Sequence, residues 1–356
     1  HTLFPYTTLF RSSIYMQGRS CLAVKDLSVA ATYFKKAAFG LGKLFLSSHI
    51  SISNVMAAHT EIQATDRHSS GLLNETDWNS LSSGLPSYYA HIASLFDSSK
   101  SHSYVIDFAR LALQFLPTHS KVSPAQSKKD TGLRADLLSR LFSSALHTAR
   151  YELAHSTLHL MPDAAIQKSN LRSLVYSLCE NSAAAELIEL PFLGMHAMVD
   201  EALSQKCTSI VDVNIGVPWH KILYAWRIRR GDFRGAAAVA YQQLQKLQQL
   251  ANGGHGKDLA LWSGKHSSGA GNDELDTPVT RQYLQLINAL SCVEPGQAWI
   301  LAEPVGRKNG VVEKRRVITL EDARRGLQDE MDRVEGILRG RFSFVGGAGD
   351  VDMDED

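Results

Sequence analysis

The sequence predicts an all-α fold, an irregular α-solenoid built from antiparallel helical hairpins. From about residue 13 to residue 250, apolar residues recur at spacings of three and four, which places them on one face of an amphipathic helix. Short joints rich in Gly, Pro and Ser separate these stripes, and short joints force consecutive helices to pack antiparallel. Runs of alternating β-branched residues, which indicate strands, are nearly absent over the same span. Helical hairpins without a sheet are typical of a solenoid.

The helices can be placed in chain order from their apolar stripes and their cap residues. Ala30, Phe34 and Ala37 belong to the first clear stripe. Pro86 is expected to open a helix near its first position, and Ser101 or Ser103 to cap the next one. The later stripes cover residues 133–147, 151–161, 165–179, 195–203, 218–228 and 233–250.

Two of these hairpins carry fragments of the tetratricopeptide pattern. Small residues in that pattern let two helices approach closely, and one aromatic ring fills the space between them. The first fragment is Gly18, Ala30, Phe34 and Ala37, and the second is Gly231, Asp232, Phe233 and Ala236. No regular 34-residue period, which tetratricopeptide arrays show, runs through the chain, so the repeats are interpreted as divergent.

Composition divides the chain into five segments. Residues 2–12 (TLFPYTTLFRS) resemble a translated sequencing adapter and are set aside, so the chain is expected to start inside a larger protein. The Gly-rich linker and the acidic end are expected to stay unfolded. The segments are 1–12, adapter-derived; 13–250, the solenoid, with a mobile excursion at 51–84; 251–278, the linker; 279–343, a C-terminal helical segment; and 344–356, an acidic disordered tail.

The C-terminal helical segment is predicted to hold two helices and a small hairpin. The first helix covers residues 280–292. Thr319 is expected to cap the second, which runs through Leu338, with Glu321 and Asp322 near its positive end. Between the helices, residues 298–301 and 311–318 can pair as strands across the glycines at 306–310.

Charge and cysteine usage argue against several classes of protein. With 37 basic and 36 acidic residues the net charge is +1, which gives no electrostatic footprint for nucleic acid or an anionic membrane. No apolar run approaches the roughly 18 residues that a membrane-spanning helix needs. The four cysteines at 21, 179, 207 and 292 are too dispersed for a zinc knuckle or a redox pair. We therefore expect neither direct nucleic-acid binding nor a membrane span.

A search for catalytic or metal-binding motifs identifies no complete site. His155 and His159 share a helical face, but no third ligand stands out, and they are interpreted as ordinary helix histidines. Gly256-Lys257 and Gly264-Lys265 lack the Ser or Thr and the first glycine of a phosphate-binding loop. The basic residues at 307–308 and 314–316 are interpreted as a solvated loop. The sequence thus predicts a protein that is not an enzyme, with no cofactor, no metal and no small-molecule substrate.

Seven segments, in order along the chain, share a pattern with a known family: the hairpin 18–38, 104–109 (YVIDFA), 171–180 (LRSLVYSLCE), 187–192 (LIELPF), 221–228 (KILYAWRI), 232–237 (DFRGAA) and 315–322 (RRVITLED). Together they resemble the scaffold nucleoporin family called nucleoporin 160 in animals and nucleoporin 120 in fungi. The resemblance covers most of residues 13–343 and is weakest at 51–84 and 251–278.

The resemblance implies a structural role in the Y-shaped subcomplex of the nuclear pore, at the nuclear envelope, in support of nucleocytoplasmic transport. It implies other scaffold nucleoporins of that subcomplex as partners. From their position in the chain, the last two helices are expected to make the contact, although apolar residues at helical spacing more often belong to a protein's own core. The candidate contact residues are Leu284, Ile287, Leu327, Met331, Val334, Leu338 and Phe342. Two other readings stay open: a tetratricopeptide-like adaptor that captures peptides, and a coat or tethering subunit of vesicle traffic.

Overall fold

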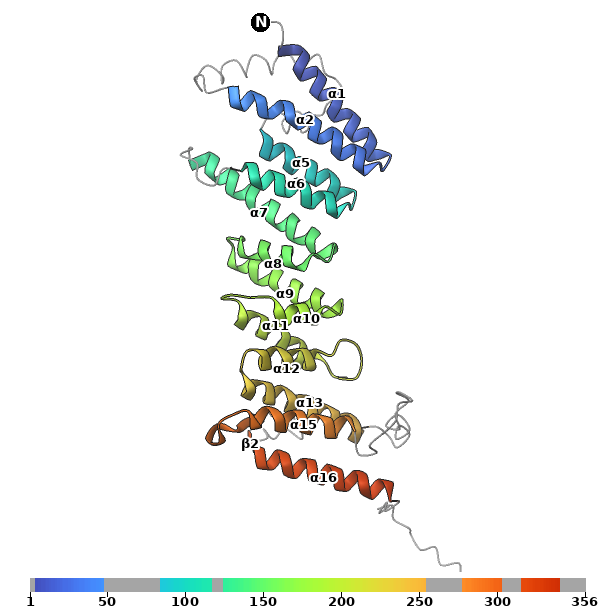
Figure 1. Cartoon of the computed structure of the whole chain (residues 1–356), viewed down its shortest axis with the longest axis vertical. Helices are drawn as coiled ribbons and strands as arrows, with labels where there is room; N and C mark the ends of the chain where they lie inside the picture. The colour runs from blue at the N-terminus through green and yellow to red at the C-terminus, as the bar shows by residue number, and fades with distance from the viewer. Residues whose placement is uncertain (1–3, 48–83, 117–123, 254–276, 303–314, 340–356) are drawn as a thin grey trace, which may run out of the picture. The chain divides into compact units, whose positions relative to one another are not determined.

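The computed structural model describes residues 4–47, 84–116, 124–253, 277–302 and 315–339 (Figure 1). Nearly all of the predicted excursion at 51–84, most of the linker at 251–278 and the whole tail at 344–356 lie outside these residues. The segment boundaries proposed for them stay predictions. The chain divides into two compact units, residues 1–177 and 178–356, which we describe separately.

The first unit is made of helices, and consecutive helices pack as hairpins. Three such pairs are α1 with α2, α5 with α6, and α7 with α8 (Figure 1). The helices are α1 (Phe4–Ala23), α2 (Leu27–Ser47), α5 (Leu85–Ser98), α6 (His102–Phe115), α7 (Pro124–His147), α8 (Tyr151–His159) and most of α9 (Ala164–Glu180). Helix α1 begins at Phe4, within residues 1–12, the segment interpreted above as adapter-derived.

The core of the first unit is centred on Phe34, in α2. This side chain is fully buried, and its ring lies 5.7 Å from that of Tyr15 and 5.9 Å from that of Phe96. Gly18 of α1 faces the same ring, because a Cβ atom built at Gly18 would lie 2.8 Å from a ring carbon of Phe34. The tetratricopeptide-like pairing predicted for the glycine and the aromatic is therefore confirmed in the packing of α1 against α2.

The second unit adds a two-stranded sheet to its helices. Strands β1 (Trp299–Ala302) and β2 (Arg316–Thr319) pair antiparallel, with Ile300 opposite Ile318, which confirms the predicted hairpin. Its intervening turn lies outside the described residues. The helices are α10 (Ala184–Glu189), α11 (His196–Ser209), α12 (Trp219–Arg229), α13 (Phe233–Gly253), α15 (Pro278–Ser291) and α16 (Leu320–Leu338), with a 3-10 turn at Pro295–Gln297.

The same turn recurs at five helix ends within the described residues. At each, one residue adopts a left-handed conformation, its N–H bonds the carbonyl three residues back, and the next N–H bonds the carbonyl five residues back. This is the Schellman arrangement, which satisfies the free carbonyls of a helix end. The following helix starts two residues after the left-handed residue every time, so the turn is the common joint of these hairpins. The left-handed residues are Lys25, Lys100, Ala149, Ser182 and Gly231.

We expect Ala149→Gly to stabilise the first unit by about 1 kcal/mol, because alanine at φ 54° carries a steric cost that glycine does not. The reciprocal change, Gly231→Ala at φ 76°, should destabilise the second unit by a similar amount. Urea denaturation of both variants measures the two effects. A destabilised Ala149→Gly protein would contradict the interpretation of this turn.

The structure corrects three local predictions. Ser101 does precede α6, but its hydroxyl bonds Ser99 and makes no capping bond to the helix. Helix α7 begins at Pro124, nine residues before the stripe expected at 133. The six-residue helix α10 was not predicted, because one and a half turns are too short to show a helical period.

Candidate protein interface

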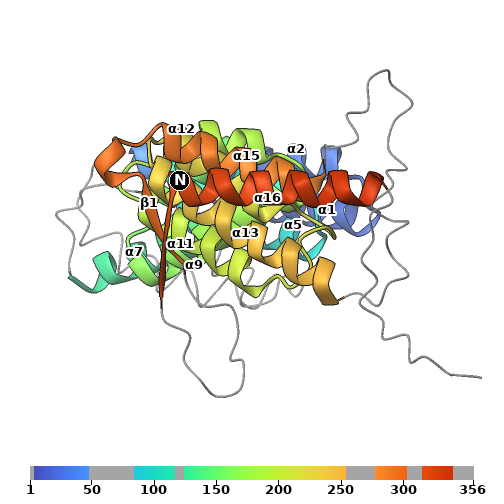
Figure 2. The ribbon, with the colours of Figure 1, turned by 90° about the horizontal axis from the view of Figure 1, so that it is seen from below.

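The predicted contact surface lies where α13, α15, the β-hairpin and α16 pack together (Figure 2). A capping box starts α15: the Thr277 hydroxyl accepts from the Thr280 N–H at 3.1 Å, and the Thr280 hydroxyl oxygen accepts from the Thr277 N–H at 2.8 Å. The inner face of α15 buries apolar side chains against α13 and the hairpin. They are Val279, Leu286, Ala289 and Leu290.

Helix α16 starts with the cap that the sequence predicts. The Thr319 N–H donates to Asp322 Oδ2 at 3.0 Å, and the Asp322 N–H donates to Thr319 Oγ1 at 3.2 Å. The hydrogen bonds from Thr319 hold the pKa of the Asp322 carboxyl below its usual value. Because β2 ends at Thr319, the same residue ends the strand and fixes the direction of α16.

Tyr283 connects three helices of this unit. A Cβ atom built at Gly326 of α16 would lie 2.8 Å from the Tyr283 ring, so the ring rests directly on the α16 backbone. On the other side, Gln248 of α13 donates to the Tyr283 hydroxyl at 3.1 Å. The position of α16 against α15 therefore depends on a glycine at 326.

The seven predicted contact residues do not share one environment. Leu284 is 48% exposed, whereas Val334 is only 7% exposed and so cannot present its side chain on the surface. Ile287 packs against the core cluster of the unit. Leu327 and Met331 are partly buried, the side chain of Leu338 is not described, and Phe342 lies outside the described residues.

The hairpin adds an exposed apolar pair that the sequence did not single out. Leu301 and Val317 lie directly opposite each other across the two strands, and they are 43% and 49% exposed. Their neighbours Ile300 and Ile318 point to the other face and are buried. Alternation within the predicted strands could have identified this pair once the register was known.

The charges of α16 are mixed but acidic on balance. Its sequence contains six acidic and three basic residues, a net charge of −3. Several pair within the helix, such as Arg333 with Glu330 at 2.6 Å. A partner that covers this helix would match it best with basic groups at the rim of the contact.

The histidines, cysteines and acidic residues of the described part of the chain were candidates for a metal or catalytic site. The described residues contain no group of three or more His, Cys, Asp or Glu side chains that could hold a metal ion. His155 and His159 contact each other, with their Nε2 atoms 3.3 Å apart. Burial raises the pKa of the Cys179 and Cys207 thiols to about 12, which disfavours the nucleophilic thiolate. Among the described helices, none has the length and apolar character to cross a membrane.

Comparison with known proteins identifies relatives over most of the chain. A family model described as nucleoporin Nup120, HEAT repeats, matches residues 3–180. Nucleoporin NUP120 of Chaetomium thermophilum is 46% identical over 301 residues, 85% of this chain and 22% of that protein. Nucleoporin nup120 of Schizosaccharomyces pombe is 22% identical over 289 residues, 81% of this chain. Mouse nuclear pore complex protein Nup160 is 24% identical over 235 residues, 66% of this chain and 14% of that protein.

Proposed function

Because the chain belongs to the nucleoporin Nup120/Nup160 family, we propose that it is part of a structural scaffold subunit of the nuclear pore complex outer ring. The observation that carries this proposal is the 46% identity to a fungal NUP120 over 85% of the chain. The chain spans only about a fifth of that relative, 22% of its length. Its localisation at the nuclear pore and its partners are therefore part of the proposal.

The partners proposed are other scaffold nucleoporins of the Y-shaped subcomplex. A helical-repeat scaffold works through exposed side chains on a rigid surface, and the second unit offers such side chains on α15 and the hairpin. The proposed contact consists of the exposed Leu284, Leu301 and Val317, together with the partly buried Leu327 and Met331 of α16. Val334 is left out because it is buried.

Family membership separates this proposal from the adaptor and vesicle-coat alternatives. The family description names HEAT repeats, which are helical hairpins like those predicted, without the regular groove of a peptide-binding tetratricopeptide array. The proposed role needs no catalytic group, cofactor or nucleic-acid contact.

We expect Leu284→Asp to weaken binding to the other Y-subcomplex nucleoporins by about tenfold or more, because an apolar contact is replaced by a desolvated charge. The thermal midpoint should change little, since Leu284 is 48% exposed. The measurement is a quantitative pull-down of the purified chain with those nucleoporins, followed by circular dichroism of the variant.

The matched control is Leu160→Asp in the first unit, where the side chain is 63% exposed. This variant should retain full binding. Unchanged recovery of the scaffold nucleoporins by the Leu284→Asp protein would remove α15 from the proposed contact. Recovery of vesicle-coat subunits in place of nucleoporins would contradict the assignment of partners.

A further inference from the structure

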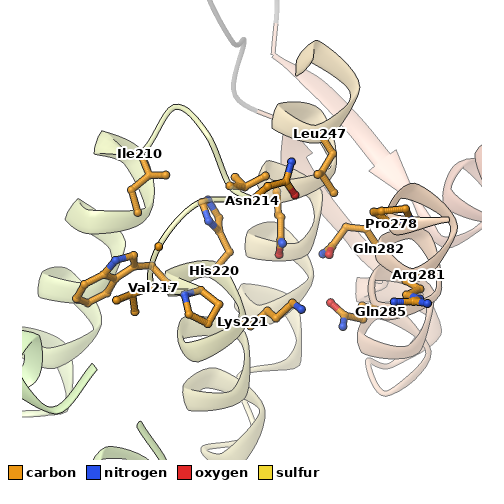
Figure 3. A pocket seen from close by; sticks show the side chains of 15 residues that line it. Ile210, Asn214, Val217, His220, Lys221, Leu247, Pro278, Arg281, Gln282 and Gln285 are labelled. Atoms are coloured by element: carbon orange, nitrogen blue, oxygen red, sulfur yellow. The ribbon is translucent and has the colours of Figure 1, made fainter. Parts of the chain in front are cut away.

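A pocket of about 350 Å³ opens in the second unit between the loop 210–218 and helices α12, α13 and α15 (Figure 3). Its volume is at the lower end of the range for sites that hold small groups or an anchoring side chain. Leu284, Leu301 and Val317 of the proposed scaffold contact do not line it. The pocket is therefore a separate candidate site.

Among the described residues, two cationic side chains and no acidic one line this pocket. Lys221 of α12 and Arg281 of α15 are both exposed, and they come from opposite walls (Figure 3). The nearby carboxylate of Asp212 is not among the lining groups and accepts from the Asn214 N–H at 2.9 Å. The lining thus has a positive electrostatic character within a unit whose last helix is acidic.

The start of α12 adds to this positive character. The α-helix begins at Trp219, after Pro218, and Pro218 supplies no capping side chain. First-turn N–H groups have no acceptor within the helix, and the helix dipole places its positive end there. The Trp219 N–H donates to the Val217 carbonyl at 2.8 Å, so the dipole is the contribution that remains. Trp219, His220 and Lys221 form this first turn and all line the pocket.

Polar groups that recognise a peptide backbone share the same walls. Four amide side chains line the pocket, and an amide offers both a donor and an acceptor. Gln282 is held in place because its Nε2 donates to the Ala240 carbonyl at 3.1 Å. The four are Asn214, Gln243, Gln282 and Gln285.

His220, in the first turn of α12, is also one of the lining residues. Its side chain is only 3% exposed, yet its buried Nε2 finds no hydrogen-bond partner among the described residues. Unpaired buried polar atoms are rare in folded proteins because each carries a desolvation cost. With almost no exposed surface, this atom is not a group that a ligand in the pocket contacts directly.

We propose that this pocket binds an acidic peptide segment of a protein partner, with one carboxylate side chain seated between Lys221 and Arg281. Arginine and lysine form charge-assisted hydrogen bonds to a carboxylate, and the amides can bond the flanking peptide groups. Nucleic acid fits less well, because phosphate backbones are bound by arrays of cations and this pocket has two. The proposal goes beyond the scaffold contact and uses different residues.

The test is fluorescence anisotropy of the purified chain with a labelled peptide of alternating Asp and Ser. The double variant Lys221→Glu/Arg281→Glu should bind this peptide about tenfold or more weakly, since two charged hydrogen-bond donors become repulsive charges. Lys100→Glu/Arg110→Glu, at exposed positions of the first unit, makes the same change in net charge and should bind normally. Circular dichroism establishes that each variant folds, and Lys221→Gln/Arg281→Gln provides a milder second variant.

Four outcomes would overturn the proposal. The first is an equal loss of binding in the control variant, and the second is equal binding of an uncharged Gly-Ser peptide. The third is heparin or single-stranded RNA binding more tightly than the peptide and through the same two residues. The fourth is peptide binding that appears only after residues 344–356 are deleted, which would assign the pocket to the chain's own acidic end. The Leu284→Asp variant should keep the peptide, which separates this test from that of the scaffold contact.

Discussion

Replacing Phe34 with alanine should lower the free energy of unfolding of the first unit by about 4 kcal/mol. The ring is fully buried and contacts the rings of Tyr15 and Phe96, while Gly18 closes over its edge. Its removal leaves a cavity between α1, α2 and α5 that the rigid helices cannot fill. Hydrogen exchange of the α1, α2 and α5 amides measures the loss locally. Val24→Ala, at a side chain 80% exposed, is the control and should have little effect.

A double-mutant cycle with Gly18 tests the cause of that loss. In the wild-type background Gly18→Ala should destabilise, because its Cβ would approach the Phe34 ring to 2.8 Å. In the Phe34→Ala background the same change should stabilise by up to about 1 kcal/mol, since alanine favours a helix over glycine. A cost for Gly18→Ala that is the same in both backgrounds would show that the two residues are not packed as described.

The helices could be predicted from the sequence because each carries its own pattern. The apolar stripe around Phe34 and the cap at Thr319 depend on residues close together in the chain, so local spacing was enough. The recurring turn at the helix ends could be predicted only in part from the sequence. Of its five left-handed residues only Gly231 is a glycine, the residue type that favours this conformation. Lys25, Lys100, Ala149 and Ser182 are not residue types that indicate a left-handed conformation in a sequence.

The candidate contact residues were chosen from apolar stripes, and the structure shows which of them are exposed, while the contact itself stays a prediction. An apolar stripe shows which residues share a face, but it does not show how much of that face another helix covers. Leu284 and Val334 both fitted the stripes, yet one is 48% exposed and the other 7%. The pocket could not be predicted from the sequence, because tertiary packing brings Lys221 and Arg281, sixty positions apart in the chain, to the same cavity. The resemblance to a family could not predict the pocket either, because similar sequence segments do not show which side chains line a cavity between helices.

Acid should destabilise the second unit through His220. Burial, with a smaller contribution from Lys246, lowers the pKa of this imidazole from 6.5 to about 4 in the folded chain. Between those two values the unfolded chain binds a proton that the folded chain does not, so stability falls as the pH falls. The total loss for this one group is about 3 kcal/mol, complete below pH 4, and above pH 6.5 its contribution is constant.

Urea denaturation of the wild-type and His220→Gln proteins across this pH range measures the effect as the difference between the two. That difference should change with pH only between about 4 and 6.5, because the glutamine side chain does not titrate. Lys246→Gln separates the two causes: burial is the larger, so this variant should keep most of the pH dependence. If the difference in unfolding free energy between the two proteins does not change between pH 4 and 6.5, His220 is protonated at the same pH in the folded and unfolded chains. Its Nε2 would then be accessible to water, contrary to the burial seen in the structure.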